Sequence, residues 1–98
     1  MAAYIWGNVE ITDPALYEQY RLQVPALIAA QGGRYLVRGG AVAALEGDYV
    51  PQRLVIIEFP DMARLWAFYD SPAYQSLVAL RQRASHGDLF AVEGYAPS

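Results

Sequence analysis

The chain has 98 residues, of which 55% are hydrophobic and 17% are charged, and its formal net charge is −3. This length predicts one domain, residues 1–98, and so much apolar surface favours a second buried surface, most simply a homodimer interface. The absence of cysteine, the single histidine and the net negative charge argue against thiolate or multi-histidine metal sites and against nucleic-acid binding.

The sequence shows no apolar run long enough to span a membrane. Its N-terminal residues also lack a basic region followed by an apolar one. We therefore expect a cytoplasmic protein without a membrane partner, and no residue set indicates a metal or another cofactor.

The N-terminal half predicts a strand, a helix and a second strand. Residues 3–11 alternate between two faces, as a half-buried strand does. Asp13 and Pro14 then begin a helix that carries an apolar stripe and ends at Gly32-Gly33, and Pro25 is expected to kink or split it. Residues 34–38 form the second strand, and residues 41–46 are expected to continue extended after Gly39-Gly40.

The C-terminal half predicts a strand, a broken helix and a last strand. Residues 53–59 contain a continuous β-branched run, which is typical of a strand covered on both faces. Asp61 caps the next helix, and Ser71 with Pro72 interrupts it and starts another helical piece. Residues 89–95 form the last strand, after a polar connection that contains His86.

The resulting order, β-α-β-β-α-β with the second helix broken, predicts an α+β fold of the ferredoxin-like split βαβ type. Such a fold has a four-stranded antiparallel sheet with its helices on one face. The other face then needs a cover, which a second copy of the sheet supplies in a dimer.

In each predicted strand the more apolar set of side chains is expected to face the helices. That face receives Ile5, Gly7, Val9, Ile11, Tyr35, Val37, Val55, Ile57, Phe59, Phe90 and Val92. The outer face receives Tyr4, Trp6, Asn8, Glu10, Arg34, Leu36, Arg38, Leu54, Ile56, Glu58, Leu89, Ala91, Glu93 and Tyr95. A mixture of charges and large apolar side chains on one face predicts a partly buried cavity or interface with paired charges.

The segment Gly32-Gly33-Arg34-Tyr35-Leu36-Val37-Arg38-Gly39-Gly40 is the basic part of that outer face. Arg34 and Arg38 lie four residues apart, so a regular strand places both guanidinium groups on one face. One interpretation is a clamp for a carboxylate or phosphate ligand. The alternative is that both arginines form structural ion pairs, with Glu58 or with carboxylates of a partner chain.

The chain resembles the DUF1330 domain proteins, small bacterial proteins of unassigned function in the dimeric α+β barrel superfamily. The residues that carry the resemblance are the segment 32–40 and Leu45-Glu46-Gly47, Arg53 to Pro60, Ala67 to Tyr74 and Val92-Glu93-Gly94. The resemblance implies a dimer whose two sheets pack face to face. It implies no established substrate, cofactor or catalytic residue.

Two hypotheses of function follow. In the first, the protein is a metal-free enzyme or binder of a small anionic or oxygen-rich ligand. Arg38 orients that ligand, Arg34 assists, Trp6 and Tyr20 line the pocket, and Glu93 belongs to the same cluster. Glu58 is the acid–base candidate, because an apolar setting raises a carboxyl pKa. In the second, the protein is non-enzymatic and its charged face only specifies the dimer.

Some polar residues have a simpler structural interpretation. Glu58 and Glu93 are more readily explained as partners of Arg34, Arg38 or Arg53 than as catalytic groups. His86 is expected to be an exposed residue without a role, although a lone histidine is a potential general base. Ser71 is interpreted as a helix cap, and Tyr69 and Tyr74 as core residues whose hydroxyl groups find partners at the rim.

Overall fold

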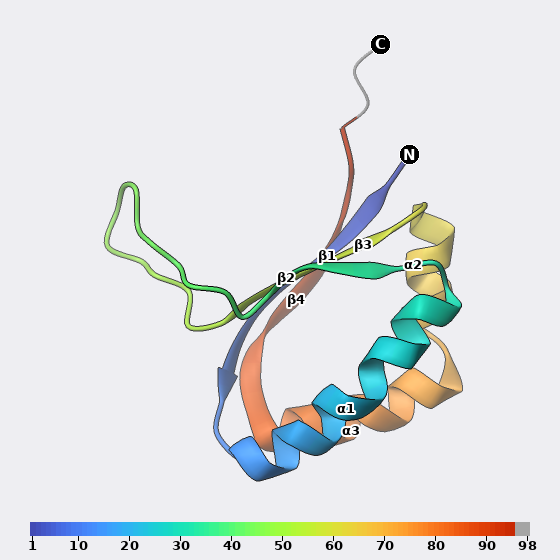
Figure 1. Cartoon of the computed structure of the whole chain (residues 1–98), viewed down its shortest axis with the longest axis horizontal. Coiled ribbons are helices and arrows are strands. Elements are labelled where there is room, and N and C mark those ends of the chain that lie inside the picture. The colour runs from blue at the N-terminus through green and yellow to red at the C-terminus, as the bar shows by residue number, and fades with distance from the viewer. Residues whose placement is uncertain (96–98) are drawn as a thin grey trace.

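The structure is a computed structural model that describes residues 1–95 (Figure 1). Its elements are β1 (Ala3–Ile11), α1 (Pro14–Ala30), β2 (Arg34–Arg38), β3 (Leu54–Phe59), α2 (Met62–Tyr69), α3 (Pro72–Ala84) and β4 (Ser85–Glu93). The strands form one antiparallel sheet in the order β2-β3-β1-β4, and Figure 1 shows the helices on one side of it. The predicted ferredoxin-like α+β fold is confirmed.

The hydrophobic core lies between the sheet and the helices. The sheet contributes Ile5, Val9, Ile57 and Phe59, and the helices contribute Tyr20, Val24, Ile28, Leu65, Phe68 and Tyr74. The rings of Phe68 and Tyr74 pack with their centroids 4.3 Å apart. Burial of these large side chains is the main stabilising contribution to such a fold.

The predicted helix starts are confirmed by their caps. The side chains of Asp13, Asp61 and Ser71 each accept a hydrogen bond from the backbone N–H three residues later. Pro14 and Pro72 occupy the first helical turn, where no intrahelical N–H is needed. The hydroxyl of Ser71 also donates to the carbonyl of Phe68, so this serine has a structural role.

Three predicted boundaries are corrected. Helix α1 runs without interruption through Pro25, so this proline does not split it. Residues 41–46 pair with no strand and belong to an exposed connection between β2 and β3, which extends away from the sheet in Figure 1. Strand β4 begins at Ser85, directly after α3, and ends at Glu93, so His86 lies in a strand.

The early start of β4 has a backbone cause. β1 continues to Ile11 and offers pairing partners to Ser85, His86 and Gly87. A Cβ at residue 87 would lie 2.1 Å from the carbonyl oxygen of Asn8, so only glycine permits this close approach. The polar sequence of this stretch resembles a loop, but the pairing with β1 decides its structure.

The two faces of β4 are the reverse of the prediction. Leu89 lies opposite Gly7 and Ala91 opposite Ile5, so these two residues are on the helix-covered side. Phe90 lies opposite Trp6 on the outer face, where the two rings stack with centroids 6.4 Å apart. The rule that the more apolar set is buried fails here, because Leu89 fills the space above Gly7 and Phe90 pairs with an outer aromatic ring.

We predict that Gly33→Ala destabilises the fold, whereas Gly40→Ala does not. A Cβ at residue 33 would lie 2.6 Å from Cε1 of Phe59 and 2.8 Å from Cγ2 of Ile28, both buried. Such overpacking costs about 1–3 kcal/mol, which lowers Tm by several degrees in a thermal unfolding experiment. A Cβ at residue 40 meets nothing within 4 Å, so this control variant keeps its Tm. Equal Tm values for both variants would contradict the packing described above.

Candidate functional site

The outer face carries an ion pair between Arg34 and Glu58. Arg34 Nε donates to Glu58 Oε1 at 2.8 Å, and the hydroxyl of Tyr4 donates to Glu58 Oε2 at 3.1 Å. The hydrogen bond from Arg34, followed by that from Tyr4, lowers the pKa of Glu58 below its ordinary value although partial desolvation opposes this. The hypothesis of a raised pKa for Glu58 is therefore wrong, and the interpretation favoured from the sequence, an ion pair with Arg34, agrees with the structure.

Arg38 does not share the face of Arg34, contrary to the sequence prediction. Arg34 pairs with Glu58 and Tyr35 with Ile57, but the register then shifts by one residue, so that Val37 lies opposite Ile56 and Arg38 opposite Val55. Such a β-bulge places an extra residue in one strand and reverses the side-chain alternation beyond it. Arg38 is thereby on the helix-covered side, and Val37 is on the outer side.

The structure separates the remaining candidates as well. Trp6 lies on the outer face, stacked on Phe90. Glu93 is exposed at the end of β4 opposite Ala3, on the helix-covered side, and it forms no salt bridge within residues 1–95. Tyr20 is buried on α1, where its hydroxyl contacts that of Tyr74 on α3. Of the six candidates, only Arg38 and Tyr20 line the same cavity.

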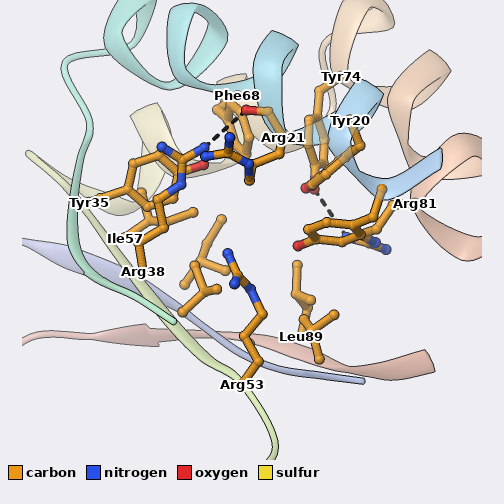
Figure 2. A pocket seen from close by; sticks show the side chains of 15 residues that line it. Tyr20, Arg21, Tyr35, Arg38, Arg53, Ile57, Phe68, Tyr74, Arg81 and Leu89 are labelled. Carbon is orange, nitrogen blue, oxygen red and sulfur yellow. Dashed lines mark hydrogen bonds between the residues drawn. The ribbon is translucent and has the colours of Figure 1, made fainter. Parts of the chain in front are cut away.

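That cavity lies between the sheet and helices α1 and α3, and we call it the arginine–tyrosine pocket (Figure 2). Its polar lining consists of Arg21, Arg38, Arg53 and Arg81 with Tyr17, Tyr20, Tyr35 and Tyr74. Apolar residues, among them Gly7, Val55 and Leu89, complete the wall. The volume open to the centre of a water molecule is about 30 Å³, which is space for roughly two waters or for one small polar group.

The charge of this pocket is not compensated by its own lining. No aspartate or glutamate lines it. Arg21 is paired with Glu18 at 2.6 Å, but Arg38, Arg53 and Arg81 form no salt bridge within the described part of the chain. Three guanidinium groups without a salt bridge thus gather around one cavity, an arrangement that has the donors and the charge to hold an anion.

Arg53 is the clearest donor without a partner. Its Nε is buried and has no hydrogen-bond partner, the one such side-chain atom among residues 1–95. Figure 2 shows its guanidinium group extending from the sheet into the pocket. Gly39 makes room for it, because a Cβ at residue 39 would lie 2.6 Å from Arg53 Nη1. A buried donor without an acceptor costs free energy and calls for a functional explanation.

Arg38 and Arg81 approach the pocket from the other sides in Figure 2. Arg38 donates to the carbonyl of Arg21 at 3.0 Å and stacks over the ring of Tyr35 at 4.4 Å. Arg81 Nη1 donates to the hydroxyl of Tyr74 at 3.1 Å. Each of these contacts occupies part of a guanidinium group that has five N–H donors, so most of the donors remain available.

The hydroxyl groups of Tyr20 and Tyr74 form a buried pair with their oxygens 2.8 Å apart. Burial is the main cause that raises the pKa of both groups, so both hydroxyls keep their protons at neutral pH. The bond between them uses one of these two protons, and Arg81 supplies the donor of its own bond. One hydroxyl proton is therefore left without an acceptor among the described residues, whichever tyrosine carries it.

Sequence reasoning missed Arg53 and Arg81. Arg81 had a detectable signal, because it follows Tyr74 and Leu77 at helical spacing and so interrupts an apolar stripe with a charge. Arg53, which the sequence suggested as a partner of Glu58 or Glu93, had no such signal, since its orientation follows from its place just before β3 and from the space beside Gly39. Tyr74 was assigned to the core, and in the structure its ring is buried while its hydroxyl faces this pocket.

Within residues 1–95 no group of three or more histidine, cysteine, aspartate or glutamate side chains is arranged to hold a metal ion. None of the described helices has the length and apolar character needed to cross a bilayer. His86 is exposed and lies opposite Glu10.

These features define a ferredoxin-like α+β protein with a basic, tyrosine-lined pocket between its sheet and its helices. The chain belongs to the family described as "Domain of unknown function (DUF1330)", whose model matches residues 2–95. A comparison with curated proteins finds no match.

Several solved structures share the fold. The RPA0582 protein of unknown function from Rhodopseudomonas palustris has 19% identity and a TM-score of 0.77, over 98% of this chain and 84% of that one. SnoaB, a cofactor-independent oxygenase from Streptomyces nogalater, has 12% identity and a TM-score of 0.64, over 98% and 95%. HapK from Hahella chejuensis has 20% identity and a TM-score of 0.59, over 98% and 99%. At these identities the likeness establishes the fold alone.

We predict that Arg34→Gln raises the pKa of Glu58 toward its ordinary value, because the largest cause that lowers it is removed. The matched control is Arg64→Gln, an exposed arginine on α2. A carbon-detected NMR titration of the Glu58 carboxyl measures its pKa in both variants. Because the folded pKa is lowered, the stabilisation by this pair is present above the unfolded pKa and disappears as pH falls through the folded one. A carboxyl that titrates above its ordinary value in the unaltered protein would contradict the ion pair.

Proposed function

We propose that the protein binds a small, oxygen-rich organic anion in the arginine–tyrosine pocket. The anion is either a ligand that the protein only binds or the substrate of a metal-free reaction. The observation that carries this proposal is the buried Nε of Arg53, which has no partner within residues 1–95. A carboxylate or another oxyanion accepts the donors that Arg53, Arg38 and Arg81 leave unused. The site thus moves from the outer face, where the sequence placed it, to the helix-covered face.

The donors in the pocket also indicate what the site does to a bound group. Guanidinium N–H groups and one tyrosine hydroxyl are oriented by the fold before a ligand arrives, and they act in a partly desolvated place. Such preorganised donors stabilise negative charge that develops on an oxygen, for example in an enolate or a phenolate. That one neighbour in fold is described as a cofactor-independent oxygenase supports an enzyme, although a binding protein uses the same donors.

Glu58 takes no part in this proposal. It lies on the outer face with Arg34 and Tyr4, and its pKa is lowered. The tyrosine hydroxyls in the pocket keep their protons at neutral pH, because burial raises their pKa values. In the proposed site these groups are donors, and the base of any proton abstraction is a part of the ligand or a water molecule.

We predict that Arg53→Met removes anion binding without lowering the stability of the ligand-free protein. Methionine keeps an apolar stem and removes both the unpaired donor and one of the mutually repelling charges. An anion that binds this pocket and is present at a concentration of a hundred times its Kd stabilises the unaltered protein by about 2.7 kcal/mol. We expect this stabilisation to disappear in the variant. Thermal unfolding of both proteins with and without acetate, benzoate and phosphate measures the stabilisation by each anion.

The matched control for this experiment is Arg83→Met. Arg83 lies on α3 two residues from Arg81, is exposed, and does not line the pocket. It tests whether the loss of any one positive charge weakens anion binding. If Arg53→Met and Arg81→Met both keep the full stabilisation by anions, the proposed site is wrong.

We also propose that the protein is a homodimer formed through the outer face. Trp6, Leu36, Phe90 and Val92 are all exposed there, with Phe90 at 56%. Exposed apolar residues gathered on one sheet face are typical of an interaction surface, and the Arg34–Glu58 pair within it supplies polar specificity. A second copy of the same face is the occupant that the family resemblance implies.

We predict that Trp6→Glu converts the dimer into a monomer. The new carboxylate places an unpaired charge in the centre of the proposed interface, beside Phe90. Sedimentation velocity measures the change, and Trp66→Glu, an exposed tryptophan on α2, is the control that stays dimeric. A monomeric unaltered protein at micromolar concentration would refute the proposed interface.

A further inference from the structure

Hydroxyl groups on the helix side of the arginine–tyrosine pocket belong to one chain of hydrogen bonds. Arg81 Nη1 donates to the hydroxyl of Tyr74 at 3.1 Å, and the hydroxyl oxygens of Tyr74 and Tyr20 lie 2.8 Å apart. A hydroxyl that accepts a hydrogen bond from a guanidinium group becomes a stronger donor and a weaker acceptor. Tyr74 is therefore the favoured donor to Tyr20, and the chain runs from Arg81 through Tyr74 to Tyr20.

The proton at the end of this chain is that of the Tyr20 hydroxyl. Burial raises the pKa of Tyr20, so its hydroxyl keeps this proton at neutral pH. The hydroxyl has its one side-chain hydrogen bond within residues 1–95 to Tyr74, where it is the acceptor in the favoured direction of the chain. Tyr20 also lines the pocket. An oxygen of a bound ligand is thus the acceptor that would complete the chain.

Charged donors reach the pocket from the sheet. Arg38 ends β2, and Arg53, which carries the buried Nε without a partner, directly precedes β3. Aromatic rings support both groups: the guanidinium carbon of Arg38 lies 4.4 Å from the ring centroid of Tyr35, and that of Arg53 lies 5.7 Å from the centroid of Tyr17. Figure 2 shows these two guanidinium groups on a different side of the pocket from Tyr20. The pocket therefore offers two kinds of donor, charged ones from the sheet and a neutral hydroxyl from a helix.

Side-chain acceptors are scarce in this pocket. Among the described residues that line it there is no carboxylate, amide or imidazole group. The side-chain acceptors that are present are tyrosine oxygens, and those of Tyr74 and Tyr20 already accept hydrogen bonds in the chain. A ligand hydroxyl would bring a further proton, and a buried donor without an acceptor costs free energy. A ligand carbonyl only accepts hydrogen bonds, so it suits this lining better.

The space in the pocket requires the two acceptor groups of a ligand to be close together. The volume open to the centre of a water molecule is about 30 Å³, so a carboxylate and a carbonyl fit there when they are on neighbouring carbons. Building on the proposed function, we infer that the ligand is a 2-oxo acid: its carboxylate binds Arg53 and Arg38, and its carbonyl oxygen accepts the hydrogen bond of the Tyr20 hydroxyl. Tyr20 is then the residue that distinguishes a 2-oxo acid from a simple carboxylic acid.

The test compares propionate, lactate and pyruvate, which have the same chain length and the same charge at neutral pH. They carry a methylene, a hydroxyl-bearing carbon and a carbonyl, respectively, next to the carboxylate. NMR chemical-shift titrations of the protein give the Kd of each acid. We expect pyruvate to bind roughly fivefold more tightly than propionate, because it gains one hydrogen bond from a neutral donor. We expect lactate to bind less tightly than pyruvate, because its hydroxyl proton lacks an acceptor.

A substitution of Tyr20 assigns this preference to its hydroxyl. Tyr20→Phe keeps the ring and removes the donor, so we expect the preference for pyruvate over propionate to disappear in this variant. The matched control is Tyr69→Phe, a partly buried tyrosine whose ring packs against Tyr74 with centroids 5.6 Å apart but does not line the pocket. We expect this control to keep the preference. Thermal unfolding verifies that both variants are folded.

The outcomes separate this inference from the proposed function. If the three acids bind equally, if lactate binds as tightly as pyruvate, or if the preference for pyruvate survives in Tyr20→Phe, the 2-oxo acid is wrong while anion binding stands. If none of the acids binds the unaltered protein, the proposed function fails and this inference fails with it. Should Tyr20→Phe not fold, the comparison of the three acids on the unaltered protein still decides, because equal Kd values overturn the inference without any variant.

Discussion

The rest of the structure depends on the pairing of β1 with both of its neighbours. This central strand pairs with β3 on one side and with β4 along its whole length on the other. Its strict alternation places Ile5, Gly7 and Val9 toward the helices. Both neighbours must match that alternation, so the register decides which side chains face the core and which face outward. It turns Leu89 inward, and Gly7, without a side chain, leaves the space in which Leu89 packs.

The second feature of consequence is the register shift in β2. Without it, Arg34 and Arg38 would lie on one face and both could serve an ion-pair network at the outer surface. With it, Arg34 stays with Glu58, and Arg38 joins Arg53 and Arg81 around a cavity without carboxylates. Bulges are frequent next to functional sites because they reorient a single side chain without ending the sheet. Here one extra residue separates the structural charges from those that are open to a ligand.

Donors greatly outnumber available acceptors in the arginine–tyrosine pocket. A folded chain tolerates a buried donor without a partner at a cost in stability, and such costs are typical of functional sites. The family match and the shared fold of proteins with very different descriptions do not reveal the ligand. The chemistry of the pocket is more informative, since its unused donors suit the acceptor-rich, negatively charged group that we propose as the ligand.

The sequence by itself determined the element order, the helix caps and three of the four strand positions, because these depend on local signals such as Asp13, Ser71 and the β-branched run in β3. It also identified Arg38 and Tyr20, two residues of the pocket. It could not determine the faces of β4 or the side of the sheet that Arg38 occupies. Both depend on register, and a shift of one residue reverses every side chain beyond it. Only the tertiary structure brought Arg53 and Arg81 together with Arg38, because residues from β2, the start of β3 and α3 meet there through packing and not through any spacing in the chain.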